Sequence, residues 1–94
     1  MRVLVVLADP VAMESIQERC SPLIADGHEI ALCYVLPVGE GLRASLETQR
    51  KITMELRQAF GASAEAIPVF VISGLDGDGV DDCAREWGAT DVKP

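Results

Sequence analysis

The chain of 94 residues is long enough for one domain and too short for a second hydrophobic core, so we treat residues 1–94 as a single domain. Its formal net charge of −7 argues against nucleic acid or an anionic membrane as a partner, because phosphates repel an acidic surface. No apolar run approaches the length of a membrane-spanning helix. The run after Arg2 is no secretory signal, since it is short and is followed by Asp9 and Glu14.

Three short runs of nearly pure apolar residues predict the fold. They are Val3–Ala8, Ile30–Leu36 and Ile67–Ile72, and helix-patterned stretches separate them. A strand covered by helices on both faces shows no polar alternation and forms a continuous block of Val, Ile and Leu instead. We therefore expect an α/β fold with an open parallel sheet, whose ligands bind at the carboxyl ends of the strands.

A first helix follows the first strand. Asp9 and Pro10 end the extended run, and apolar residues then recur at the three-to-four spacing of a buried helical stripe: Met13, Ile16, Cys20, Leu23 and Ile24. Pro22 lies late in this pattern and predicts a kink near Cys20 and Ser21, because proline lacks the backbone donor of the helical bond. Gly27 predicts the end of the helix in the left-handed conformation.

A second helix follows Pro37 and the turn at residues 39–41. Its pattern includes Leu42, Leu46, Ile52, Leu56 and Phe60, and Gly61 closes it. The basic residues on it alternate with Glu47 and Glu55, which predicts a solvated face in preference to a phosphate site. These basic residues are Arg43, Arg50, Lys51 and Arg57. A passage of small residues, 62–66, leads to the third strand.

The third strand is expected at an edge of the sheet, because Pro68 cannot donate to a central ladder. A turn and a short helix are expected after this strand, and the helix ends at Gly88. The start of a fourth strand follows over 89–92. The apolar face of the helix consists of Val80, Cys83, Ala84 and Trp87. With strand three at an edge, the predicted strand order is 3-2-1-4.

Right-handed crossovers then place the first two helices on one face of the sheet and the third helix alone on the other. A helix is about 10 Å wide, whereas four strands about 4.8 Å apart make a wider sheet. One face is therefore under-covered, and we expect another subunit, or further residues of the chain, to fill it.

The three cysteines, Cys20, Cys33 and Cys83, are an odd number without close spacing. At least two of them fall on apolar positions of the helix patterns. This favours reduced core thiols in a cytoplasmic protein over a disulfide framework or a metal site.

The strands and their ends carry a family resemblance. The first run, Arg2–Asp9, ends in aspartate; the second, Ile30–Pro37, has Tyr34 where a histidine is usual; the third match covers Val69–Gly74 and Gly79–Val92, with a glycine turn, a helix and a Gly-Ala-Thr-Asp entry to strand four. In this order and spacing, over nearly all of the chain, the sequence resembles the universal stress protein family.

The resemblance implies a three-layer α/β/α fold of the adenine nucleotide alpha hydrolase-like or flavodoxin-like type. It implies a cytoplasmic, usually homodimeric protein of stress adaptation with no established catalytic reaction, some members of which bind ATP. By the same correspondence Asp9 faces the ribose, the Val35 backbone pairs with adenine, and Leu7 lines the base.

Two further family features lie beyond what residues 1–94 contain. They are the glycine-rich loop that wraps the phosphates after strand four, and a fifth strand that often makes the dimer contact. We accordingly expect a short or C-terminally truncated member, whose sheet lacks a fifth strand and which offers about half of a nucleotide site.

The residues around Asp9 support two different roles for its carboxylate. A carboxylate at a strand end beside the reversal of strand order often meets a sugar hydroxyl. An aspartate before proline also caps a helix, since its side chain accepts amide hydrogen bonds and proline is favoured at the first helical position. Both roles remain open at this stage.

The other polar candidates indicate no metal site and no catalytic residue. The acidic stretch Asp76, Asp78, Asp81 and Asp82 differs from a calcium loop, with Val80 at an oxygen-ligand position and Trp87 in place of the twelfth-position glutamate. His28 is the only histidine and falls at a turn. Ser73 lacks the Gly-x-Ser-x-Gly frame of a nucleophile elbow.

The sequence supports one leading function and one alternative, and it excludes a third. The leading one is a binding or regulatory domain of the universal-stress type, with ATP as a possible ligand. The alternative is a small α/β enzyme, a phosphoester or nucleotide hydrolase, that uses a strand-end carboxylate such as Asp9. A phosphoacceptor receiver domain is excluded, because the strand ends supply neither its acidic pair nor its acceptor aspartate.

Overall fold

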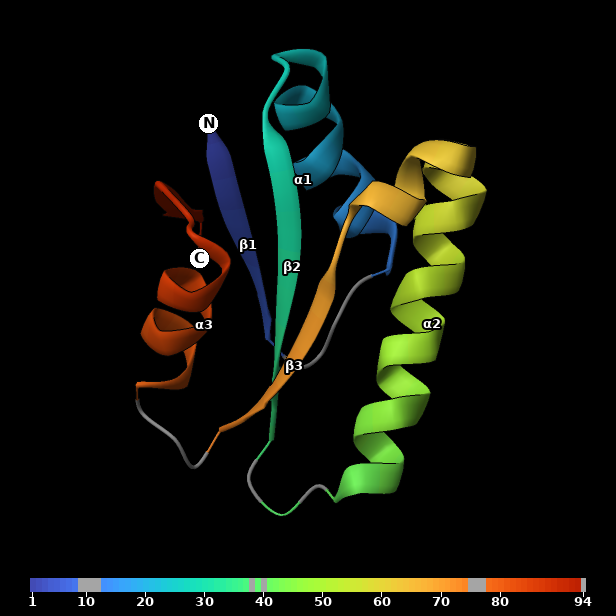
Figure 1. The fold of residues 1–94 in the computed structure, drawn as a ribbon. Helices are drawn as coiled ribbons and strands as arrows, with labels where there is room; N and C mark the ends of the chain where they lie inside the picture. Colours follow the sequence, from blue (N-terminus) through green and yellow to red (C-terminus); the bar gives the residue numbers. More distant parts are fainter. Residues whose placement is uncertain (9–12, 38, 40, 75–77, 94) are drawn as a thin grey trace.

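Strands and helices alternate along the chain in the structure, a computed structural model that describes residues 1–8, 13–37, 39, 41–74 and 78–93, the side chains of Met13 and Ser73 excepted. Figure 1 shows the elements in colour from the N-terminus to the C-terminus. In chain order they are β1 (Arg2–Ala8), α1 (Met13–Ala25), β2 (Glu29–Leu36), α2 (Leu42–Phe60), the 3-10 helix η1 (Gly61–Ala66), β3 (Val69–Ser73), α3 (Gly79–Trp87) and β4 (Asp91–Lys93).

The four strands form one parallel sheet in the order β3-β2-β1-β4, which confirms the predicted topology and the place of β3 at an edge. β1 pairs with β2 along its whole length, from Arg2 opposite Glu29 to Ala8 opposite Val35. β4 is short and pairs only with residues 3–5 of β1. The carboxyl end of β1 therefore has a strand neighbour on one side only.

Arg19 of α1 covers the end of β4. Its Nη1 donates to the Val6 carbonyl at 2.8 Å, and its Nη2 donates to the Lys93 carbonyl at 3.1 Å. The guanidinium group supplies donors where the strand ladder stops, since a carbonyl without a partner there would cost free energy.

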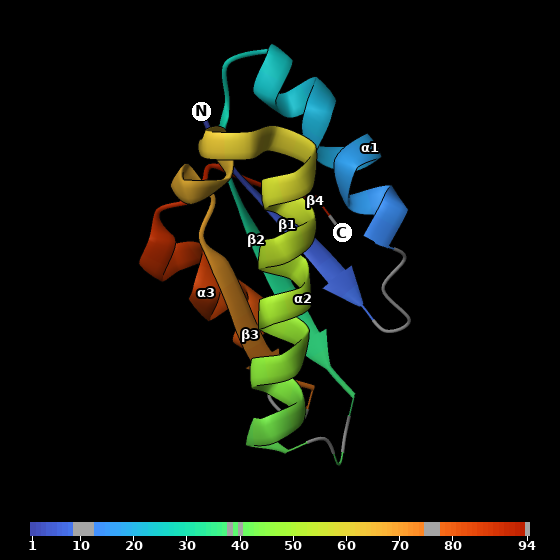
Figure 2. The ribbon, with the colours of Figure 1, turned by 90° about the vertical axis from the view of Figure 1, so that its right-hand side faces the viewer.

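The helices cover the two faces of the sheet unequally (Figures 1 and 2). α1 and α2 lie on one face, above a large core that contains Leu7, Leu32, Tyr34 and the most buried residues of both helices. α3 lies alone on the other face, over a smaller cluster of Leu4, Ala31, Cys33, Cys83 and Ala84. This confirms the predicted assignment of the helices to the two faces.

The three helices end near glycines, as predicted, and Pro22 lies within α1 without ending it. Gly27, Gly61 and Gly88 follow the three helices with φ of 84°, 61° and 84°, the region that favours glycine. α1 continues through Pro22 as one helix to Ala25, so the expected kink does not interrupt it.

The apolar pattern of α2 was a poor guide to burial at its start. Ile52 and Leu56 are buried as expected, whereas Leu42 and Leu46 are 76% and 53% exposed. α2 has 19 residues and β3 has 5, so at about 1.5 Å and 3.3 Å per residue the helix is much the longer element. These two leucines lie on the flank of α2 toward Gln49, whose side chain reaches the Val69 carbonyl at the outer edge of β3, so the described strands provide no cover for them there.

The segment between α2 and β3 also differs from expectation. The small residues form η1, and β3 begins at Val69, two residues later than predicted. Pro68 still joins the sheet through its carbonyl, which accepts a hydrogen bond from the Leu32 amide at 2.9 Å.

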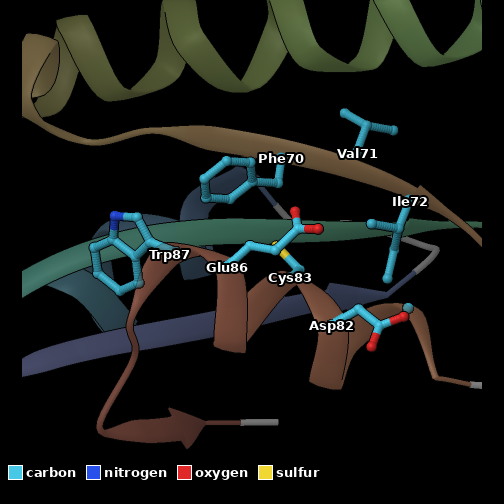
Figure 3. Close-up of a pocket in the computed structure, with 8 residues that line it drawn as sticks. Phe70, Val71, Ile72, Asp82, Cys83, Glu86 and Trp87 are labelled. Carbon is cyan, nitrogen blue, oxygen red and sulfur yellow. The ribbon is translucent and has the colours of Figure 1, made fainter.

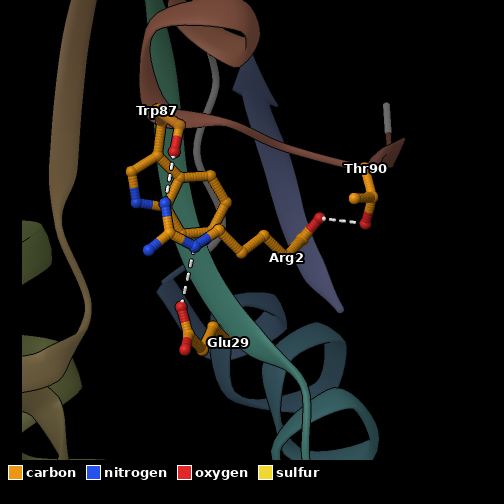
Figure 4. A network of polar contacts seen from close by, with 4 residues as sticks. All are labelled: Arg2, Glu29, Trp87 and Thr90. Carbon is orange, nitrogen blue, oxygen red and sulfur yellow. Dashed lines mark hydrogen bonds and ion pairs between the residues drawn. The ribbon is translucent and has the colours of Figure 1, made fainter.

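Arg2 ties the amino end of the sheet to the end of α3 (Figure 4). Its Nε donates to Glu29 Oε2 at 2.9 Å, its Nη1 donates to the Trp87 carbonyl at 2.6 Å, and its guanidinium lies 5.5 Å from the centre of the Trp87 ring. The Arg2 carbonyl accepts the Thr90 hydroxyl at 3.0 Å. One residue thus joins β1, β2, α3 and the segment before β4.

We predict that the two charges of this network contribute unequally to stability. Glu29→Gln is expected to lower the free energy of unfolding by less than about 1 kcal/mol, because the ion pair is exposed to water. Arg2→Ala also removes the bond to the Trp87 carbonyl and the stacking on the ring, so we expect a loss of about 1–2 kcal/mol. Denaturant unfolding of both variants measures the difference, and equal losses would contradict this assignment.

We predict that Gly74 tolerates no side chain. Its amide donates to the Leu36 carbonyl at 3.0 Å, and a Cβ at this position would lie 2.5 Å from that oxygen. Gly74→Ala should lower the free energy of unfolding by about 1–3 kcal/mol, since backbone atoms have to move apart. Gly41→Ser is the control: the space around it is open, and serine is favoured before a helix, so its stability should not fall.

Candidate functional site

Of the residues predicted to meet a nucleotide, Leu7 and Val35 lie at the carboxyl ends of β1 and β2, but their side chains do not come together. Asp9 lies outside the described residues. Leu7 is 3% exposed and packs in the core beneath α1 and α2. Val35 is half-buried and, by the alternation of side chains along β2, lies on the opposite face from Tyr34 and Leu36. The side chains of Leu7 and Val35 therefore point to different faces of the sheet.

A different set of residues shares the face of Val35. The register pairs Val35 with Ala8 on one side and with Ile72 on the other. Ala8 is exposed, and Val35 and Ile72 are half-buried. We call these three residues the carboxyl shelf. It is an apolar platform three strands wide, on the face that α3 covers only in part.

Next to the shelf, a groove runs between β3 and α3 (Figure 3). Phe70 and Ile72 reach it from β3, and Cys83 and Trp87 reach it from α3, in a volume of about 700 Å³. The carboxylates of Asp82 and Glu86 stand on its α3 side. The groove combines an apolar floor with an acidic rim, and it follows from the single helix on this face.

This arrangement limits what the site can bind. A flat apolar ring can stack on the shelf or in the groove, and the rim carboxylates can accept hydrogen bonds from hydroxyl or amino groups. Free phosphates are repelled by the same carboxylates and by the net charge of −7. The site therefore favours a neutral ring or a cation over an anion.

The three thiols are free and buried, as the sequence predicted. Burial raises the pKa of Cys20 to about 11, against an ordinary value of 9.0. Burial, together with the neighbouring Cys83 thiol, raises the pKa of Cys33 to about 12, and burial also raises the pKa of Cys83. Cys33 on β2 and Cys83 on α3 are neighbours in the smaller core, which therefore contains a thiol pair. In this state the thiols are protonated near neutral pH.

The remaining polar candidates have structural positions. His28 is half-buried in the turn before β2, and its amide donates to the Leu23 carbonyl at 3.0 Å. Asp78, Asp81 and Asp82 are exposed around the start of α3, while Asp76 lies outside the described residues. Over the part of the chain that the structure describes, no group of three or more His, Cys, Asp or Glu is placed to hold a metal. The basic residues of α2 are exposed, as predicted.

Fold and site together define an open parallel α/β domain with an apolar platform at the carboxyl end of its strands. Comparisons of the chain with protein-family models, curated proteins and solved structures gave no significant match. In the ranges that the structure describes, none of the helices has the length and apolar character needed to cross a membrane.

We predict that the buried thiols make the fold sensitive to alkaline pH. A thiol whose pKa is raised in the folded state binds its proton more tightly there, so its contribution to stability is constant below about pH 9 and is lost as pH rises toward about 12. The slope is up to about 1.4 kcal/mol per pH unit for each such thiol. The free energy of unfolding of Cys33→Ala should therefore approach that of the parent chain as pH rises, or exceed it. The difference between these two free energies is the stability gap. Urea unfolding at pH values on either side of 9 measures the gap, and a constant gap would contradict the raised pKa.

Proposed function

We propose that the chain is a binding or regulatory domain of the universal-stress type, which works by association and takes the adenosine part of an adenine nucleotide on the carboxyl shelf. The observation that carries this proposal is the register of Ala8, Val35 and Ile72, which forms an apolar platform at the carboxyl end of three adjacent parallel strands.

The position of the platform supports the proposal. β1 has β2 on one side and β4 on the other, and the helices before these two strands lie on opposite faces of the sheet. Open α/β sheets bind their ligands in the crevice at this reversal, outside the carboxyl ends of the strands. Ala8 lies at the end of β1, directly at that point.

The charge of the site sharpens the expected ligand. Asp82 and Glu86 border the adjoining groove, and the chain is acidic as a whole. We therefore propose that adenosine contributes most of the affinity, and that each added phosphate weakens binding unless Mg²⁺ neutralises it. A role in stress adaptation follows from the resemblance alone and is part of the same proposal.

We predict that calorimetric titration shows tighter binding of adenosine than of ADP, and of ADP than of ATP, when Mg²⁺ is absent. Val35→Arg should weaken adenosine binding about tenfold or more, because it places a long charged chain on the platform. Asp9→Asn tests the ribose contact, and Asp26→Asn, an exposed carboxylate near the opposite end of the sheet, is its control.

Three outcomes would decide against the proposal. No measurable binding of adenosine by the folded chain would remove the ligand assignment. If Val35→Arg and the parent chain bind adenosine equally, the shelf is not the binding site. Turnover of a phosphoester substrate that Asp9→Asn abolishes would favour the enzyme alternative instead.

A further inference from the structure

The outer edge of β3 has backbone groups that face away from the sheet. The carbonyl of Pro68 bonds to the Leu32 amide, and the amide of Gly74 bonds to the Leu36 carbonyl, so the even-numbered residues of this strand face β2. Val69, Val71 and Ser73 therefore direct their amides and carbonyls outward. Among these groups, the Val69 carbonyl accepts Gln49 Nε2 of α2 at 3.0 Å.

That contact also shows which flank of α2 lies over the free edge. Residues of α2 on the same side as Gln49 include Leu42, Leu46, Arg50 and Arg57, and all four are exposed. The opposite flank, which includes Ala44, Thr48, Glu55 and Ala59, is half-buried. Figure 2 draws α2 in front of β3 and β2, with α1 on the far side from β3. The exposed leucines are thus beside the edge strand.

We propose that β3 and this flank of α2 form an interface with a second copy of the chain, in which the two β3 strands pair antiparallel across a two-fold axis at Val71. Val71 then faces Val71 of the second copy, and the two residues exchange both of their backbone hydrogen bonds. The two four-stranded sheets become one continuous sheet of twice the width. This surface adjoins the carboxyl shelf, with which it shares Ile72.

The register of α2 over β3 makes the flank self-complementary. Val71 is two residues beyond Val69, about 6.6 Å along the strand, which equals about four residues of helix. α2 runs antiparallel to β3 (Figure 2). Counted from the Gln49 contact, the axis therefore passes near Ser45 of α2. Each residue of α2 then faces the residue of the second copy's α2 for which the two residue numbers add to about 90. Leu42 meets Leu46 of the second copy, and Arg43 meets Glu47.

This match in apolar character and in charge is why we assign the surface to a second copy. The four residues Leu42, Arg43, Leu46 and Glu47 already form one concave exposed patch with Arg50. Two leucines 76% and 53% exposed lose contact with water when the patch pairs with itself. Isologous contacts of this kind are the common form of homodimer interface.

The other face of the sheet gains contacts from the same axis. Phe70 and Ile72 lie on either side of Val71 and point to the groove face, where both are half-buried. Antiparallel pairing at Val71 brings Phe70 opposite Ile72 of the second copy, and such apolar cross-strand pairs stabilise sheets. The single axis therefore covers part of the face that α3 leaves open.

The test is sedimentation equilibrium of the purified chain from micromolar to millimolar concentration, with a matched pair of variants. Leu46 and Met54 are 53% and 55% exposed on α2, but Met54 lies eight residues further along the helix, about 12 Å from Leu46, and the pairing about Ser45 brings no α2 residue of the second copy opposite it. Leu46→Glu should raise the dimer dissociation constant by about a hundredfold or more, whereas Met54→Glu should leave it nearly unchanged. Circular dichroism checks that both variants fold.

Charge reversal tests the predicted pairing directly. Arg43→Glu and Glu47→Arg should each weaken the dimer, and the double variant should restore it, because the opposite charges meet again across the axis. A chain that stays monomeric at millimolar concentration would overturn the proposal. The outer edge of β3 would then be a candidate for pairing with a strand of another protein. A dimer that responds equally to Leu46→Glu and Met54→Glu, or shows no rescue in the double variant, would overturn it as well.

Discussion

The burial of β1 and β2 from both faces is the constraint on which the rest of the structure depends. The two strands pair over seven residues, and Leu4, Ala31 and Leu32 at their centre have no exposed surface. Parallel strands of this kind need an apolar cover on each side of the sheet. One side has two helices of 13 and 19 residues, and the other has a single helix of 9.

This unequal cover explains where the two proposed binding surfaces lie. The face under α3 keeps a groove, a shelf of small and aliphatic side chains, and a thiol pair below them. The β3 edge, farthest from β4, lacks a strand neighbour on its outer side. Apolar groups near water in one region of a small domain favour association, because burial of such surface on a ligand or partner is favourable.

The sequence was informative wherever one residue type restricts the backbone. Pro68, which cannot donate to a strand ladder, predicted the edge position that β3 occupies, and Gly27, Gly61 and Gly88 indicated where helices end. The site was less predictable. The family resemblance assigned Leu7 to the base, and the structure places its side chain in the core, on the face opposite to Ala8 and Val35. Ile72 belongs to the same platform through register with β2, and register is a property of paired strands.

By itself the sequence determined the class of fold, the strand order and the buried thiols, since apolar blocks, a proline and the helical spacings act through local physical chemistry. Only the tertiary structure decided which apolar residues are buried. Leu42 and Leu56 follow the same helical pattern, but Leu42 lies toward the outer edge of β3 and Leu56 packs in the core. Burial depends on what lies opposite a side chain, and that partner comes from a distant part of the chain.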